Sequence, residues 1–165
     1  MRRSAAAIGS AAFFVVAPGT VVGLVPWLIT GWAVPGCGAA WRAVQVLGVL
    51  LIVAGLVPLM HAFTQFAKAG GTPMPLAPPE HLVVTGFNRY VRNPMYVGLL
   101  LVIIGQALLF GSLSLVLYAA LVWIATASFV HWYEEPTLAR QYESEYEAYR
   151  RNVRAWLPRP RPWTP

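Results

Sequence analysis

Polar side chains gather in the segment 86–98, where the chain enters a long uncharged run. The segment follows a loop rich in proline and glycine, so it belongs at the mouth of a membrane span. Arg89 and Arg92 could simply anchor a helix end at the lipid headgroups. Together with two tyrosines and two asparagines, they could instead form a binding site for a polar ligand. The spacing alone leaves both interpretations open.

Two adjacent carboxylates, Glu134 and Glu135, follow the uncharged run 93–133. A glutamate pair at a membrane edge costs free energy unless a partner satisfies its charge. That partner could be Arg89 or Arg92, with a further contribution from the N-terminus of the next helix. The alternative is a ligand that carries hydroxyl groups and positive charge.

The composition is that of an integral membrane protein. Of the 165 residues, 58% are hydrophobic and 11% are charged, whereas a soluble domain carries about a quarter charged residues. The formal charge of +6 fits contact with anionic lipids, so we predict no nucleic-acid partner. Cys37 is the single cysteine and excludes an intrachain disulfide. No metal site is predicted, because the chain lacks Asp and the spacing of His61, His81 and His131 does not suit ligands.

Four membrane spans are predicted. Residues 4–41 are uncharged but interrupted by proline and glycine, so they could form one kinked span or two. A second span covers about 41–66. The run 93–133 is long enough for two spans of about 20 residues each, with the turn at 111–114.

The third and fourth spans should form an antiparallel hairpin, whose open end places Pro94 beside Tyr133. The two polar clusters would then meet on one side of the membrane. Small residues on this hairpin allow close helix packing and could also serve a homodimer. On the second span, His61 and Gln65 share one face, where they could bond to a neighbouring helix or line a polar cavity.

An amphipathic helix is predicted after the last span. Pro136 suits the first turn of a helix, and apolar or aromatic residues then recur at intervals of three and four. This stripe should lie along the inner membrane interface or pack over the site. Its members are Leu138, Tyr142, Tyr146, Tyr149 and Val153.

The predicted fold is all-α: a polytopic membrane helical bundle of about four transmembrane helices with a C-terminal amphipathic interfacial helix. One domain covers 1–165, with N-terminal spans in 1–66 and a short tail at 159–165. Four spans place every Lys and Arg except Arg42 on one side, which puts both termini in the cytoplasm. We expect the plasma membrane of a bacterial cell. The loop 69–80 is either a stiff linker or a lid over the site.

The segment 86–98 reads GFNRYVRNPMYVG, and the glutamate pair follows at the end of the next hairpin. Together they resemble the membrane methyltransferases, which include the isoprenylcysteine carboxyl methyltransferases and the phospholipid N-methyltransferases. The shared pattern is Gly-x-x-x-x-x-Arg-(His or Asn)-Pro-x-Tyr-x-Gly, then Glu-Glu, then a helix rich in tyrosine. The resemblance covers about 71–158, and the N-terminal spans carry no part of it.

The resemblance implies that S-adenosylmethionine (SAM) binds at the cytoplasmic membrane edge, in the half 67–158, without a Rossmann domain. Carboxylates favour the ribose diol and the sulfonium of SAM, and arginine or backbone N–H groups favour its carboxylate. By family position, Glu134 and Glu135 would contact the cofactor. The full set of expected cofactor-binding residues is Gly86, Tyr90, Arg92, Asn93, Pro94, Tyr96, Gly98, Glu134 and Glu135.

Methyl transfer is an in-line displacement, so its rate depends on alignment of the nucleophile and exclusion of water. A carboxylate nucleophile needs no base, and Arg92 could hold it. An amine must lose a proton, for which His131 is the candidate base, although it could equally be a packed interfacial histidine. Asn93 stands where the carboxyl methyltransferases usually show histidine. This departure weakens the expectation of a prenylcysteine substrate more than the expectation of SAM as the cofactor.

The implied acceptor is lipophilic and reaches the site from the bilayer: a prenylated thiol acid, a phospholipid amine or another isoprenoid acid. Two other classes stay open. A steroid-reductase-like membrane oxidoreductase would use NADPH and would need groups for a second nucleotide half, and no such set is evident. A non-catalytic membrane partner or lipid-binding protein would be expected to lack Arg92 or the glutamate pair, and these are present.

Overall fold

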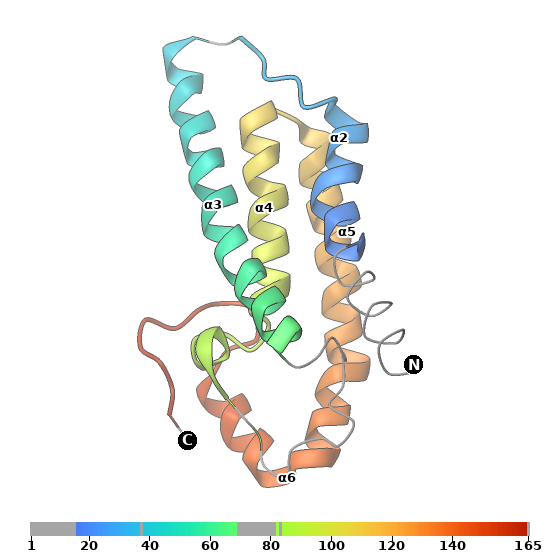
Figure 1. Ribbon diagram of the computed structural model, residues 1–165, viewed down its shortest axis with the longest axis vertical. Helices are drawn as coiled ribbons and strands as arrows, with labels where there is room; N and C mark the ends of the chain where they lie inside the picture. Colours follow the sequence, from blue (N-terminus) through green and yellow to red (C-terminus); the bar gives the residue numbers. More distant parts are fainter. Residues whose placement is uncertain (1–15, 37, 69–81, 83, 165) are drawn as a thin grey trace.

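The computed structural model describes residues 16–36, 38–68, 82 and 84–164, and every regular element in this part of the chain is helical (Figure 1). The loop 69–80, His81 and the first part of the N-terminal apolar run lie outside the described residues. In chain order the elements are η1 (Thr20–Leu24), α2 (Val25–Thr30), α3 (Ala39–Lys68), η2 (Gly86–Arg89), α4 (Pro94–Phe110), α5 (Leu113–Phe129), η3 (Val130–Glu134) and α6 (Glu135–Asn152).

Apolar helices with outward-facing side chains indicate a membrane protein. Two helical runs, Ala39–Ala62 and Leu113–Asn152, are long and apolar enough to cross a bilayer, and only 17% of the most apolar window of each is buried. Val16–Thr30 and Pro94–Phe110 are shorter apolar helices, and both lie alongside the longer ones in Figure 1. Exposed apolar surface on this scale needs lipid rather than water around it. The number of four spans stays a prediction.

Two glycine pairs hold α3 against α4. A Cβ on Gly48 would lie 2.6 Å from the carbonyl oxygen of Gly105, and a Cβ on Gly55 would lie 2.6 Å from that of Gly98. The glycines of each helix are seven positions apart, so both pairs fall on one face of two antiparallel helices. Close packing of backbones through glycine is a common way to join helices in lipid. The small residues Gly98 and Gly105 therefore pack on α3 within the chain.

Two prolines follow π-helical turns, and at the first of them, Pro26, side chains bind the freed carbonyls. Pro26 has no N–H to donate to the carbonyl of Val22, and η1 precedes it, with Val25 N–H donating five residues back to Thr20. Gln106 of α4 donates to the oxygen of Val22 at 2.8 Å. The hydroxyl of Tyr118, on α5, donates to the neighbouring carbonyl of Val21 at 3.0 Å. The proline thus creates acceptors by which the first helix is joined to the α4–α5 hairpin.

A second π-helical turn, η3, precedes Pro136. In η3, Glu135 N–H donates five residues back to Val130, so α5 continues into α6 without a break at the proline. The sequence predicted a new helix that starts at Pro136, whereas α6 (Glu135–Asn152) continues the helix of α5 and η3. The reversal of direction comes later, at Glu143, which has a φ of 41° and a ψ of −112°. Figure 1 shows the second half of α6 folded back toward the start of α4.

The turn between α4 and α5 is confirmed. Gly111 ends α4 in the left-handed conformation with a φ of 62°, where glycine is the least strained residue. Ser112 then caps α5, because its hydroxyl accepts the backbone N–H of Leu115.

The predicted aromatic stripe of α6 forms a small core. Tyr146, Tyr149 and Val153 are buried together with Val84. Leu138, Ala139 and Tyr142, which precede the change of direction at Glu143, pack against this core. Leu82 and Trp163 also pack against it. This cluster packs over the segment 86–93, since the hydroxyl of Tyr149 donates to the carbonyl of Asn88 at 2.7 Å.

Candidate functional site

An ion pair joins the two motif blocks. Arg92 lies in the short connection between η2 and α4, and Glu135 begins α6. Arg92 Nη2 lies 2.6 Å from Glu135 Oε1, and the two side chains are only 11% and 13% exposed. Arg92 Nη1 also donates to the carbonyl of Arg150, whose own guanidinium lies 4.0 Å from Glu135 Oε2. A largely buried carboxylate therefore lies near two cations.

A second pair lies beside the first. The hydroxyl of Tyr96, in the first turn of α4, donates to Glu134 Oε1 at 2.8 Å. Glu134 follows the apolar part of the α5 helix. Burial raises the pKa of Glu134 above its ordinary value, the hydrogen bond from Tyr96 lowers it, and the charge of Glu135 raises it again. Burial is the largest of these effects, so the ionised form of Glu134 is disfavoured in the folded protein.

The C-terminal residues 154–163, which we call the strap, bind along the segment 89–93. Arg92 N–H donates to the carbonyl of Arg154 at 2.9 Å, and Asn93 donates from both its backbone and its Nδ2 to Ala155, at 3.3 and 3.1 Å. Further along, Arg159 N–H donates to Tyr90, and Trp163 exchanges bonds with Arg89. The sequence predicted a short tail at 159–165 and missed this pairing.

Trp156 of the strap lies between the polar cluster and α5. Its ring is 6.5 Å from that of Tyr96 and 6.4 Å from that of Trp123, the latter edge-on. No pattern in the sequence marks this residue as part of the site, because the contact depends on how the strap folds back.

The predicted site residues fall into three groups. Arg92, Tyr96 and the glutamate pair form the polar cluster described above, and Asn93 binds the strap at Ala155. Gly86 and Gly98 serve backbone contacts: Gly98 packs on Gly55, and Gly86 has a φ of 56° and leaves room for His61, whose Cε1 would lie 2.6 Å from a Cβ. That close approach to His61 would make any side chain at position 86 clash.

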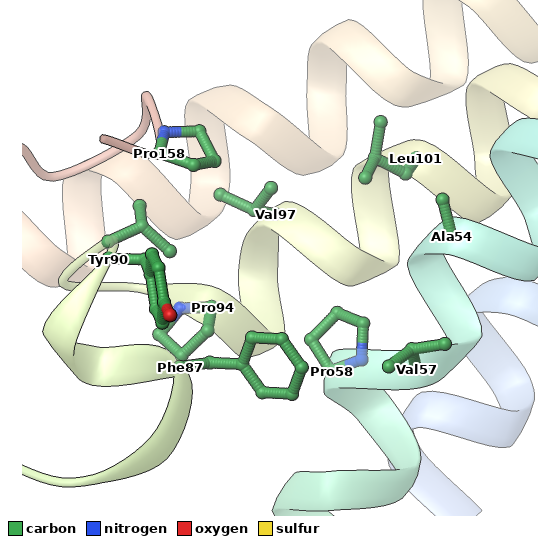
Figure 2. A pocket seen from close by; sticks show the side chains of 10 residues that line it. Ala54, Val57, Pro58, Phe87, Tyr90, Pro94, Val97, Leu101 and Pro158 are labelled. Carbon is green, nitrogen blue, oxygen red and sulfur yellow. The ribbon is translucent and has the colours of Figure 1, made fainter. Parts of the chain in front are cut away.

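Tyr90 and Pro94 belong to the third group, which lines an apolar cavity of about 290 Å³ (Figure 2). The cavity lies between α3, the start of α4, η2 and the strap. Its lining residues are Ala54, Val57, Pro58, Phe87, Tyr90, Val91, Pro94, Val97, Leu101 and Pro158. Among these described residues, the hydroxyl of Tyr90 is the one polar side-chain atom.

His131 is placed differently from the other candidates. It lies in η3 with an exposed side chain, and its ring contacts that of Trp132 edge-on at 6.3 Å. His61, on the other hand, contacts Phe87 of the motif edge-on at 5.1 Å. Within the described ranges, no group of three or more His, Cys, Asp or Glu side chains could hold a metal ion.

A comparison with known families gives a match that contains both motif blocks, the segment 86–98 and the glutamate pair. The model of the family described as phospholipid methyltransferase matches residues 43–145, which is more than half of the chain. Searches of the curated proteins and of the solved structures give no significant match. The matched range contains α4, α5, the arginine of the ion pair and both glutamates. The chain belongs to the phospholipid methyltransferase family of membrane methyltransferases.

Proposed function

We propose that the protein uses SAM to methylate a lipophilic acceptor at the cytoplasmic surface of the membrane. Family membership supports methyl transfer in general. The single observation that carries the proposal is the polar cluster, because the Arg92–Glu135 and Tyr96–Glu134 pairs bring the two motif blocks into one partly buried site. The cluster lies beside an apolar cavity, as a reaction between a polar cofactor and a lipid would require.

The side chains of the cluster fit the chemistry of SAM. Arg92 Nε is buried and has no hydrogen-bond partner among the described residues, so a guanidinium N–H is left for a carboxylate. Glu134 and Glu135 supply carboxylate oxygens for hydroxyl groups and for a nearby positive charge. When bound, SAM supplies an electrophilic methyl group. We expect Arg92, Glu134 and Glu135 to hold it, and Tyr96 to orient Glu134.

The protein's contribution to rate would be alignment and exclusion of water. Trp156 and the strap cover Tyr96, and buried apolar residues lie on the other side of α4. An acceptor carboxylate would need no base, whereas an acceptor amine would need His131 or another group to take its proton. His131→Gln tests His131 as this base, because it would slow methylation of an amine only if His131 takes the proton and would leave methylation of a carboxylate unchanged.

Calorimetric titration tests the cofactor. SAM and its demethylated product should bind the protein in phosphatidylcholine nanodiscs with micromolar affinity, and the double variant Glu134→Gln/Glu135→Gln should lose this binding. Glu147→Gln is the matched control, because Glu147 pairs with Arg151 on the exposed surface of the same helix. Binding of NADPH in place of SAM would overturn the proposal and favour a membrane oxidoreductase. Equal SAM binding by the double variant would remove the site assignment.

A further inference from the structure

The strap runs along the inner edge of the apolar helices. Near its start, the ring of Trp156 contacts that of Trp123 on α5, and Trp123 is 47% exposed. Two positions later, Pro158 lines the apolar cavity together with Ala54 and Val57 of α3, which are exposed as well. In Figure 1 the strap passes the start of α4 at the height where α3 ends. Exposed apolar residues of α3 and α5 face lipid, so the strap lies at the boundary between lipid and water.

The exposed side chains of the strap suit this boundary. Leu157, between the two residues that contact the apolar helices, is 63% exposed. Arg154 and Arg161, near the two ends of the strap, are exposed as well. A leucine at this depth can enter the edge of the hydrocarbon, while arginine side chains extend their charged groups to the lipid headgroups. The strap thus combines apolar contact with positive charge at one level of the membrane.

The positive charge of the strap is not balanced by acidic residues. No acidic residue follows Glu147 in the sequence, whereas five arginines do: Arg150, Arg151, Arg154, Arg159 and Arg161. The first two lie at the end of α6 near carboxylates, at 4.0 Å from Glu135 and 2.9 Å from Glu147. Arg159 donates to the uncharged carbonyl of Asn152. Within the described residues, the side chains of Arg154 and Arg161 make no hydrogen bond or ion pair. In this part of the chain, three arginines of the strap therefore lack a counter-charge.

The strap also holds the backbone of the polar cluster. The N–H of Arg92 donates to the carbonyl of Arg154 at 2.9 Å. Further along, the N–H of Arg159 donates to the carbonyl of Tyr90, also at 2.9 Å. Two of the arginines without a counter-charge are thus bonded through their own backbones to the segment that carries Arg92. A ligand bound to these arginines would restrain that segment.

We infer that the strap binds the headgroups of anionic phospholipids and that this binding holds the strap against the segment 89–93. Arginine suits a lipid phosphate, because its guanidinium offers several N–H donors in a fixed arrangement. Clusters of about four to eight basic residues next to a membrane helix attract anionic lipids. Lipid binding follows from the strap alone. A resulting gain in SAM affinity, through the position of Arg92, rests on the proposed function.

Hydrogen–deuterium exchange in nanodiscs tests the inference. One set of discs contains phosphatidylcholine alone, and the other contains phosphatidylcholine mixed with anionic phosphatidylglycerol. Peptides that cover the segment 89–93 or the strap should exchange about tenfold more slowly, or slower still, in the anionic discs, because each arginine near an anionic surface contributes about fivefold to binding. Raising the salt concentration from about 0.15 M to about 1 M should remove most of this difference, since the charges are exposed.

Removing the exposed charges of the strap should remove the difference between the discs. Arg154→Gln/Arg161→Gln deletes two exposed charges without breaking a bond within the described residues. The same variant in anionic discs controls for the slower exchange that a negative surface potential causes by itself. Arg154→Lys/Arg161→Lys keeps the charges and should keep most of the difference. Arg42→Gln/Arg140→Gln is the matched control, because it removes two exposed charges outside the strap, and it should behave as the wild type.

Three outcomes would overturn the inference. These are equal exchange in the two kinds of disc, an undiminished difference in Arg154→Gln/Arg161→Gln, or equal slowing by soluble polyglutamate in phosphatidylcholine discs, which would indicate an acidic protein partner instead. Calorimetry with SAM on the same discs separates the two proposals, and SAM should bind more tightly in the anionic discs. Lipid-dependent exchange without SAM binding would refute the proposed function and leave the strap assignment intact. SAM binding with equal exchange in both discs would do the reverse.

Discussion

Arg92 and Glu135 lie 43 positions apart and form an ion pair at 2.6 Å, with both side chains largely buried. The pair connects the start of α4 to the start of α6, and it places Glu135 between Arg92 and Arg150. Because each partner loses water on folding, the free energy of the pair depends on both being present.

Glu135→Gln should therefore destabilise the protein strongly. The change leaves the Arg92 charge buried without its counter-charge, at a cost of about 3 kcal/mol. The matched control is Glu147→Gln, which breaks the exposed Arg151–Glu147 pair and should cost less than about 1 kcal/mol. Thermal unfolding in a mild detergent measures both. Equal losses of stability in the two variants would contradict the role given to the buried pair.

Substitution of a glycine in the contact between α3 and α4 should destabilise the protein. Gly98→Ala adds a Cβ that would lie 2.7 Å from the carbonyl oxygen of Gly55, so α3 and α4 must move apart. The expected loss is about 1–3 kcal/mol of unfolding free energy. Gly23→Ala, at a helical position where the added Cβ meets nothing within 4 Å, should be neutral or slightly stabilising. A tolerated Gly98→Ala would show that the close approach is dispensable.

Gln106 and Pro26 should be energetically coupled. Gln106→Leu removes the donor to the Val22 carbonyl, at a cost of about 1 kcal/mol in a membrane protein. In a Pro26→Ala background the restored N–H can satisfy that carbonyl, so the same change should cost less. A double-mutant cycle of thermal unfolding gives the coupling. Additive effects would mean that Gln106 acts through packing alone.

Stability should depend on the ionisation of Glu134. The pKa of Glu134 is raised in the folded state, so the stability associated with its protonated form is complete below the unfolded pKa of about 4.3 and is lost as the pH rises through the folded pKa. Glutamine at position 134 does not ionise, so Glu134→Gln does not lose stability in this way as the pH rises. The variant should unfold at a higher temperature than the wild type at neutral pH, with a gain that vanishes toward acidic pH. A gain of the same size at both pH values would exclude ionisation as its cause.

Asn93 should hold the strap through its amide. Asn93→Asp keeps the shape but replaces the Nδ2 donor by an oxygen that faces the carbonyl of Ala155, at the place of a 3.1 Å hydrogen bond. An acceptor opposite an acceptor destabilises the contact, so trypsin should cleave after Arg154 faster than in the wild type. Asn152→Asp, which breaks a bond to Ala148 on the exposed surface, is the control and should not change this rate, as read by intact mass.

Local features of this fold could be predicted from the sequence. Uncharged apolar runs, the Gly111–Ser112 turn and the aromatic stripe of α6 follow from hydropathy, capping and periodicity, which act between near neighbours along the chain. The meeting of the two polar clusters could also be predicted, because a helical hairpin leaves its two ends side by side, whereas the choice of Arg92 over Arg89 as the partner of Glu135 could not. Buried charge then requires a partner.

Other features depend on contacts between distant segments that no local pattern marks. The strap follows the segment 89–93 through backbone bonds, which any residue type can make, so composition gave no signal for it. Gly48 pairs with Gly105, and Gly55 with Gly98, only because α3 and α4 are antiparallel and in one register. The direction of α6 changes at Glu143 and not at Pro136, because a wide turn accommodates the missing N–H of the proline and lets the helix continue.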